Sequence, residues 1–220
     1  MTTAELPRGR IGIYLGLGRV SNLPTVWTDV LAGAVLAGGE RDAATLSALS
    51  ASLSAFYVGG MFLNDAFDRE IDRRERPERP IPSGRITAVE VFLVVGALLA
   101  AGLAGAALVA TPGARSGAAI SGLILGALVV LYDAWHKGNA LAPFFMGLCR
   151  AAVYVTAGLA AGGTLTAPLV GGCAPWIMWP CEGNPQVYRP HPSSRIDRRA
   201  GPPGHQPALV LASPDQGPVP

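Results

Sequence analysis

Charge is scarce in this sequence. Asp, Glu, Lys and Arg together make up 15% of the 220 residues, and the formal net charge is only +2. A nearly neutral chain lacks the strongly basic surface that nucleic acids select, so we expect no nucleic-acid partner. Hydrophobic residues make up 50% of the chain and the mean hydropathy is +0.36. This composition indicates a membrane protein and argues against a water-soluble domain.

Cysteine and lysine are also rare. The three cysteines, Cys149, Cys173 and Cys181, form neither a paired disulfide framework nor a metal-binding spacing. Lys137 is the only lysine among 17 basic residues, which singles it out for attention. The N-terminal segment has no small-residue cleavage motif after a short apolar core, so we expect no cleaved signal peptide.

Long apolar segments are abundant, and their spacing predicts an all-α fold. We expect a polytopic transmembrane helical bundle of about five spanning helices, because a crossing needs about 20 apolar residues. The first predicted crossing is short and contains Pro24, and Asp29 follows in the same segment. A charge at that depth is costly, so we expect Asp29, and likewise Arg150 in the last crossing, to face a partner or a cavity. The predicted crossings are residues 20–38, 44–66, 87–110, 117–132 and 140–163.

The scarce charge is concentrated in one stretch, residues 61–87, which holds six acidic residues and six arginines. On a helix, Asn64, Asp68 and Asp72 would follow one another at intervals of four residues on one face, with Asp65 beside them. Like charges this close need a cation in front of them, and carboxylate and amide oxygens suit Mg²⁺. Arginines downstream would then bind phosphate oxygens that the metal leaves free. The stretch therefore predicts part of a diphosphate site.

A simpler interpretation of this stretch stays open. A helix that leaves a membrane often ends in mixed charges because it has reached water. In that case the acidic and basic side chains would pair locally along the helix surface. The candidate pairs are formed by Arg69, Arg73 and Arg76 with Asp65, Asp72 and Glu75.

The pattern Asn64-Asp65-x-x-Asp68-x-x-x-Asp72, followed by Arg79-Pro80-x-x-Ser83-Gly84 and a new apolar helix, resembles the first Asp-rich motif of the UbiA superfamily of intramembrane prenyltransferases. The resemblance implies a bundle of about eight to nine helices in the complete fold. It also implies an enzyme that holds an isoprenyl diphosphate with Mg²⁺ on two Asp-rich motifs and transfers the prenyl group to an acceptor, usually aromatic. It assigns metal binding to Asn64, Asp65, Asp68 and Asp72, and diphosphate binding to Arg79 and Arg76.

Two further segments resemble the same superfamily. The sequence Arg19-x-x-Asn22-Leu23-Pro24 resembles the opening of its first helix, which implies that Arg19 and Asn22 face the active cavity. A snorkelling arginine and a helix-capping asparagine are the alternative. Tyr132 and Lys137 resemble a Tyr and a Lys that point towards the diphosphate, although four residues separate them here where the common pattern has three. The resemblance makes Lys137, with Asp68 and Asp72, a catalytic candidate. An aromatic belt with a snorkelling lysine is the alternative.

His136 lies three residues after Asp133, and its role stays open between a proton relay, a metal ligand and plain polar surface. The run from Asp133 to Arg150 also resembles a UbiA-like subgroup of ebo-type gene clusters, which is associated with export of a metabolite precursor. This gives a second hypothesis for function, a non-catalytic membrane component that binds or exports such a precursor.

The last part of the chain has a different composition. Eleven of the nineteen prolines lie between Pro175 and Pro220, and a segment so rich in proline can neither span a membrane nor fold alone. We therefore divide the chain into a partial transmembrane domain, residues 1–172, and a tail, residues 173–220. The tail is either disordered or the product of a reading-frame shift near residue 172. No Asp-x-x-x-Asp follows residue 137, so the second Asp-rich motif is missing. An active transferase and an inactive incomplete copy are both open at this point.

The distribution of basic residues predicts the orientation. With a cytoplasmic N-terminus, ten basic residues of the N-terminal segment and the connecting loops lie inside, and two, Arg41 and Arg115, lie outside. We therefore expect a multi-pass protein of the inner (plasma) membrane whose phosphate-binding loops face the cytoplasm.

Overall fold

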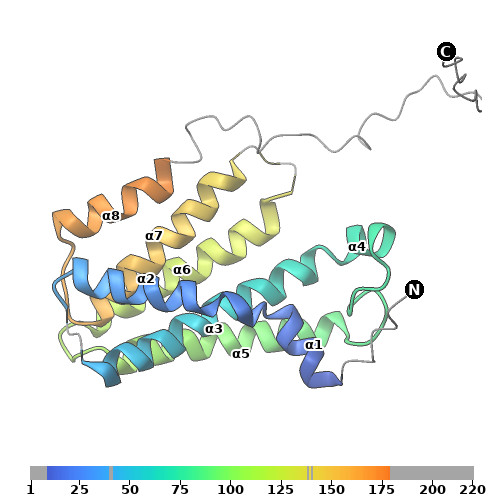
Figure 1. Ribbon diagram of the computed structural model, residues 1–220, viewed down its shortest axis with the longest axis horizontal. Helices are drawn as coiled ribbons and strands as arrows, with labels where there is room; N and C mark the ends of the chain where they lie inside the picture. The colour runs from blue at the N-terminus through green and yellow to red at the C-terminus, as the bar shows by residue number, and fades with distance from the viewer. Residues whose placement is uncertain (1–8, 40–41, 138, 140, 179–220) are drawn as a thin grey trace, which may run out of the picture. The chain divides into compact units, whose positions relative to one another are not determined.

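The computed structural model describes residues 9–39, 42–137, 139 and 141–178. Within these ranges the chain forms helices and no strands, which confirms the predicted all-α class (Figure 1). In chain order the elements are α1 (Arg10–Leu17), the 3-10 helix η1 (Val20–Asn22), α2 (Leu23–Leu36), α3 (Ala43–Phe67), α4 (Arg69–Glu75), α5 (Ala88–Val109), α6 (Arg115–Trp135), α7 (Ala142–Ala160) and α8 (Ala167–Met178).

Four of the described helices, α3, α5, α6 and α7, are long and apolar enough to cross a membrane. Their bounds lie within a few residues of four predicted crossings. The remaining predicted crossing, residues 20–38, is the first in the chain. Its helix is shorter than predicted because η1 occupies the start of the segment and α2 has only 14 residues. At about 1.5 Å per residue, α2 is about 21 Å long, less than a bilayer core of about 30 Å. Pro24 lies in the first turn of α2, where a missing N–H is tolerated.

Side-chain caps define where two of the spanning helices begin. The Asp42 carboxylate accepts a hydrogen bond from the backbone N–H of Thr45 at 2.9 Å and so starts α3. These contacts with Thr45 lower the pKa of the exposed Asp42 carboxyl group. The Thr87 hydroxyl accepts from the backbone N–H of Glu90 at 3.1 Å and starts α5. Each cap satisfies a donor that the first helical turn would otherwise leave without a partner.

Glycines let α2 and α7 pack backbone against backbone. A Cβ atom on Gly33 would lie 2.5 Å from the carbonyl oxygen of Tyr154, and one on Gly158 would lie 2.6 Å from the Cβ of Ala37. Both distances are too short for any side chain, so these positions require glycine. Such close approach of small residues is a usual way to hold membrane helices together.

The outer surface of the bundle is apolar. Leu93 is 70% exposed, Leu108 74% and Ile120 59%, and each lies on a spanning helix. In water such a surface would be unstable, whereas in a bilayer these side chains meet lipid and the helices satisfy their own backbone groups. The chain is a multi-pass membrane protein.

The connections gather at two ends of the bundle (Figure 1). The Asp-rich segment with α4, the helix α1 and the last turn of α6 share one end. Glu90 at the start of α5 accepts hydrogen bonds from Arg10 and Tyr14, which fixes α1 at this end. The turns that follow α2, α5 and α7 lie at the opposite end, where the backbone N–H of Thr164 donates to the carbonyl of Ala37 at 3.1 Å. Segments far apart in the sequence therefore meet at the Asp-rich end.

The predicted boundary at residue 172 falls inside α8, which continues to Met178. Residues 179–220, most of the predicted tail, lie outside the described residues. The division into a domain and a tail stays a prediction.

Candidate functional site

The Asp-rich segment passes from α3 to α4 through Asp68. Its backbone stays in the right-handed helical region (φ −76°, ψ −6°). The N–H of Asp68 donates to the carbonyl of Asn64 at 3.0 Å, and its own carbonyl accepts from the N–H of Asp72 at 2.9 Å. Helical hydrogen bonding therefore continues across the junction. Asn64, Asp68 and Asp72 remain one turn apart, as their spacing predicts.

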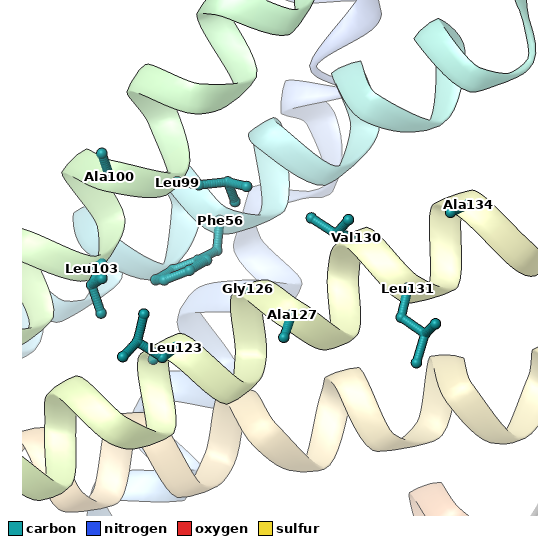
Figure 2. Close-up of a pocket in the computed structure, with 11 residues that line it drawn as sticks. Phe56, Leu99, Ala100, Leu103, Leu123, Gly126, Ala127, Val130, Leu131 and Ala134 are labelled. Atoms are coloured by element: carbon teal, nitrogen blue, oxygen red, sulfur yellow. The ribbon is translucent and has the colours of Figure 1, made fainter.

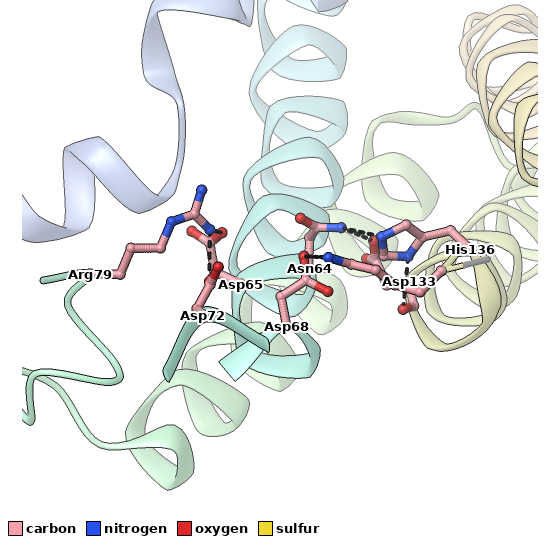
Figure 3. A network of polar contacts seen from close by, with 8 residues as sticks. Asn64, Asp65, Asp68, Asp72, Arg79, Asp133 and His136 are labelled. Carbon is pink, nitrogen blue, oxygen red and sulfur yellow. Dashed lines mark hydrogen bonds and ion pairs between the residues drawn. The ribbon is translucent and has the colours of Figure 1, made fainter. Parts of the chain in front are cut away.

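The three aspartates of this segment are buried. Asp65 is 9% exposed, Asp68 7% and Asp72 6%. A buried carboxylate at the edge of a membrane needs a cationic partner, because desolvation penalises the charge. Figure 3 shows one such partner, Arg79, beside Asp65 and Asp72.

Arg79 binds two of these carboxylates. Its Nη1 atom lies 3.0 Å from Asp65 Oδ1 and 2.8 Å from Asp72 Oδ2. Arg79 belongs to the loop between α4 and α5. Its backbone N–H donates to the carbonyl oxygen of Arg76 at 3.0 Å, which closes a turn directly after α4. Arg79 follows this turn, seven residues beyond the Asp72 whose carboxylate it binds.

Lys137 binds the remaining carboxylate from the other side. Its Nζ atom lies 3.0 Å from Asp68 Oδ2, directly after the end of α6. The structure thus brings both predicted cations, Arg79 and Lys137, to the Asp-rich segment. The aspartates divide between them, with Asp65 and Asp72 on one side and Asp68 on the other.

The simpler interpretation, local pairing of charges along the helix surface, suggested ion pairs of Arg69, Arg73 and Arg76 with Asp65, Asp72 and Glu75. Among the described residues, none of these pairs forms. Arg73 pairs with Glu70 at 3.1 Å, and Arg69 donates to the carbonyl oxygen of Ala66 at 2.9 Å. The side chain of Arg76 is exposed at the end of α4, so its assignment to the diphosphate still depends on the sequence.

The last turn of α6 also contacts Asn64. The Nδ2 atom of Asn64 donates to Asp133 Oδ1 at 3.3 Å and lies 3.5 Å from His136 Nε2. The Nδ1 atom of His136 lies 3.1 Å from the carbonyl oxygen of Asp133, and the His136 ring stacks on Tyr132 at 5.1 Å between centroids. Asp133 is only 4% exposed. The sequence did not predict that Asp133 belongs to the site, because its contact with Asn64 joins two helices.

A cavity of about 560 Å³ opens beside these residues, between α2, α3, α6 and α7. Arg19, Asn22 and Tyr132 line it together with Asn64. Arg19 has a φ of +44°, which is strained for a residue with a side chain. Residues held in such conformations cluster at binding sites, although this observation alone assigns no role to Arg19.

The two intramembrane charges predicted to face a cavity or a partner meet in the wall of this cavity. Arg150 Nη2 lies 3.2 Å from Asp29 Oδ2, and the Tyr154 hydroxyl donates to Asp29 Oδ1 at 3.3 Å. The prediction for Asp29 and Arg150 is confirmed. Tyr154 was missed, although its position four residues after Arg150 places both on one face of α7.

A second hollow, also of about 560 Å³, lies between α3, α5 and α6 (Figure 2). Its lining residues are Phe, Leu, Val, Ala and Gly, including Phe56 and Leu103. It offers no polar group to a charged ligand and is not the candidate site.

The donor chemistry of the Asp-rich end fits magnesium bound together with a diphosphate. Among the described residues, no three His, Cys, Asp or Glu side chains are placed to hold a metal ion by themselves. Mg²⁺ needs no such cluster, because it commonly takes one or two carboxylates, keeps several waters and binds substrate phosphates. Asn64, Asp65, Asp68 and Asp72 supply oxygen donors of this kind within two turns of the chain.

Comparison with known proteins agrees with the sequence resemblance. Residues 25–181 match the model of the UbiA prenyltransferase family. Digeranylgeranylglyceryl phosphate synthase of Ignicoccus hospitalis is 47% identical over 94 residues, which cover 43% of this chain and 30% of that protein.

Solved structures of the family have the same fold. A structure described as digeranylgeranylglyceryl phosphate synthase in membranes aligns with a TM-score of 0.66 and 26% identity, covering 77% of this chain and 59% of that one. A UbiA homologue from Archaeoglobus fulgidus bound to DMAPP and Mg²⁺ aligns with a TM-score of 0.58 over 73% of this chain and 58% of that one. Its identity of 17% supports the fold alone.

This chain spans only part of the length of the proteins that it matches. The matched part of this chain covers between 30% and 59% of the length of these proteins. The narrower subgroup of ebo-type clusters stays a prediction. The family model nevertheless covers most of this chain, and the chain belongs to the UbiA prenyltransferase family.

Proposed function

We propose that this chain carries the first diphosphate-binding site of a UbiA-type prenyltransferase and binds an isoprenyl diphosphate there with Mg²⁺. The observation that carries the proposal is the meeting of Arg79 and Lys137 over the buried Asp65, Asp68 and Asp72 at one end of the bundle. Acidic and basic side chains that neutralise one another in the free protein have the composition that a metal-bound diphosphate requires.

Binding would exchange partners at this end. Asp68 and Asp72, helped by Asn64 and Asp65, would hold Mg²⁺, which neutralises the diphosphate as a leaving group. Arg79 and Lys137 would turn from carboxylate oxygens to phosphate oxygens. The planar guanidinium of Arg79 suits two phosphate oxygens at once, while the Lys137 ammonium acts as a point charge. Each ion pair lost is replaced by another, so the buried carboxylates keep a cation throughout.

The cavity beside Asn64 is the place for the reacting groups. In the proposed transfer, the bond between the first prenyl carbon and the diphosphate oxygen breaks, and a bond from that carbon to the acceptor forms. The diphosphate leaves with the electron pair of the broken bond, and the acceptor's proton passes to water or to the released diphosphate. Tyr132, Arg19 and Asn22 line this cavity, where they are suited to orienting the head group.

The names of the similar proteins suggest the substrates. Digeranylgeranylglyceryl phosphate carries two geranylgeranyl groups, so we propose geranylgeranyl diphosphate as donor and a glyceryl phosphate that already carries one such group as acceptor. Isoprenyl diphosphates are charged and water-soluble at their head. We therefore propose that the Asp-rich end faces the cytoplasm from the inner (plasma) membrane, with the N-terminus on the same side, as the basic residues predict.

Binding and transfer are tested separately. The full chain in nanodiscs is titrated with geranylgeranyl diphosphate in Mg²⁺ and in EDTA, and we expect binding that EDTA abolishes. Equal binding in EDTA, or none in either buffer, would contradict the proposed site.

Product formation is then measured with geranylgeranylglyceryl phosphate as acceptor. Turnover would show that the first Asp-rich motif suffices in this chain. Binding without product would contradict the proposed transfer by this chain and leave the proposed binding site standing.

A further inference from the structure

The side chain of Asn64 is held by two acceptors from α6. Its Nδ2 atom donates to Asp133 Oδ1 at 3.3 Å and faces His136 Nε2 at 3.5 Å. An amide nitrogen carries two hydrogens, so these two acceptors account for both. Figure 3 shows the nitrogen of Asn64 directed towards Asp133 and His136, and its oxygen directed away from them.

The neighbouring contacts fix the roles of the His136 nitrogens. Nδ1 lies 3.1 Å from the carbonyl oxygen of Asp133 and must carry a hydrogen to bond to it. Nε2 is then the acceptor of the neutral ring, as the contact with Asn64 requires. Stacking on Tyr132, with 22° between the ring planes, holds the imidazole in this orientation. The arrangement determines which way the Asn64 amide points.

We propose that Asp133 and His136 are positioning residues that present the Asn64 Oδ1 atom to the Mg²⁺–diphosphate complex. The inference rests on the proposed function, because it assumes that Asn64 is a metal ligand. Neither residue touches the metal in this account. They act by removing the alternative orientation of the amide, in which its hydrogens would face a cation.

Packing alone does not account for this polar contact. The same face of α3 meets α6 at Gly60, where an added Cβ would lie 3.0 Å from Val129, so the two helices already approach closely without it. A carboxylate that is 4% exposed on a spanning helix is costly. Lys137, two residues after the end of α6, binds Asp68, so the end of α6 and the residues that follow it contact two proposed metal ligands.

Substitutions at position 133 separate positioning from direct coordination. Asp133→Asn keeps an acceptor oxygen for the Asn64 amide, whereas Asp133→Leu removes it. The measurement is the Mg²⁺ concentration that gives half-maximal binding of geranylgeranyl diphosphate to the full chain in nanodiscs. We expect about a tenfold increase for Asp133→Leu, the effect of one lost hydrogen bond, and less than about twofold for Asp133→Asn. Equal losses in the two variants would mean that the carboxylate charge matters and would overturn the proposal.

His136→Phe provides an independent test. The phenyl ring keeps the stack on Tyr132 but offers no nitrogen, so we expect about a fivefold increase in the Mg²⁺ midpoint. Leu131→Ala, on the exposed face of the same helix, is the matched control and is expected to leave the midpoint unchanged.

A ligand-free measurement distinguishes failure of this inference from failure of the proposed function. The chain has four asparagines, so ¹⁵N-asparagine labelling gives few side-chain amide signals. We expect the Asn64 amide signals to move in Asp133→Leu and His136→Phe and to stay in Leu131→Ala. Unmoved signals would show that Asp133 and His136 do not position the Asn64 amide, and this would overturn the inference whether or not the diphosphate binds. If the signals move but the chain binds no diphosphate, the proposed function is contradicted. The positioning role proposed for Asp133 and His136 is then contradicted with it.

Discussion

Two clusters of aspartate and arginine in this protein use the same chemistry in different surroundings. Arg79 binds Asp65 and Asp72 from a loop, and Arg150 binds Asp29 between two packed helices. The backbones of α2 and α7 are in contact at Gly33, which leaves Asp29 and Arg150 little freedom to separate. Arg79, in contrast, lies on the loop between α4 and α5 and is not part of a helix, although Ile81 of the same loop packs against the core. We therefore expect the first cluster to exchange partners on binding and the second to hold the bundle together.

The largest expected effect is on the packed cluster. Asp29→Asn removes the buried carboxylate that pairs with the partly exposed Arg150, and we expect the free energy of unfolding to fall by about 3 kcal/mol, the lower end of the range for breaking a buried pair. Denaturant unfolding in detergent measures it. The double variant Asp29→Leu, Arg150→Met replaces both charges by apolar groups and should recover most of the loss. An equally unstable double variant would show that the ion pair is not the cause.

Neutralising the exchanging cluster should weaken ligand binding instead. In the double variant Asp68→Asn, Asp72→Asn, we expect Mg²⁺-dependent binding of geranylgeranyl diphosphate to weaken about 100-fold, equivalent to about 2.7 kcal/mol. Stability should change less than in Asp29→Asn, because Lys137 is 47% exposed and Arg79 keeps its ion pair with Asp65. Glu70→Gln, which removes an exposed carboxylate of α4, is the matched control. If Glu70→Gln weakens diphosphate binding equally, the loss reflects the total negative charge at this end of the protein and not a specific site at Asp68 and Asp72.

Arg79→Lys sharpens the account of the loop. Lysine keeps the charge but cannot bond to two groups at fixed angles, so we expect about tenfold weaker binding of the diphosphate, or about 1.4 kcal/mol. Isothermal titration calorimetry compares it with Arg76→Lys, an exposed arginine of the same loop. Should Arg76→Lys have the larger effect, the diphosphate would lie further out than proposed.

The smallest expected effect lies outside both clusters. Thr87→Ala removes the cap of α5 and should lower the free energy of unfolding by about 1 kcal/mol. Diphosphate affinity should not change. A change in affinity would show that the start of α5 is coupled to the Asp-rich end.

Much of the fold was predictable because long apolar runs have few alternatives in a membrane. The runs that became α3, α5, α6 and α7 gave nearly correct bounds. The bounds predicted for the crossing at residues 20–38 were too wide, because hydropathy counts apolar residues and takes no account of backbone conformation. The 3-10 helix Val20–Asn22, which follows the left-handed residue Arg19, takes up the start of that segment before α2 begins.

The site was predictable in composition but not in its pairings. Spacing along the chain placed Asn64, Asp68 and Asp72 together. The division of the aspartates between Arg79 and Lys137 depends on a loop conformation and on where α6 ends. The contact between Asn64 and Asp133 joins residues of two helices, and no local pattern encodes it.

The central claim is that the buried aspartates take up a divalent cation when a diphosphate arrives with it. Electron paramagnetic resonance of the full chain with Mn²⁺ in place of Mg²⁺ tests this directly. We predict bound Mn²⁺ only when geranylgeranyl diphosphate is present, and none in the double variant Asp68→Asn, Asp72→Asn. Mn²⁺ bound equally without diphosphate, or equally in the double variant, would contradict the account.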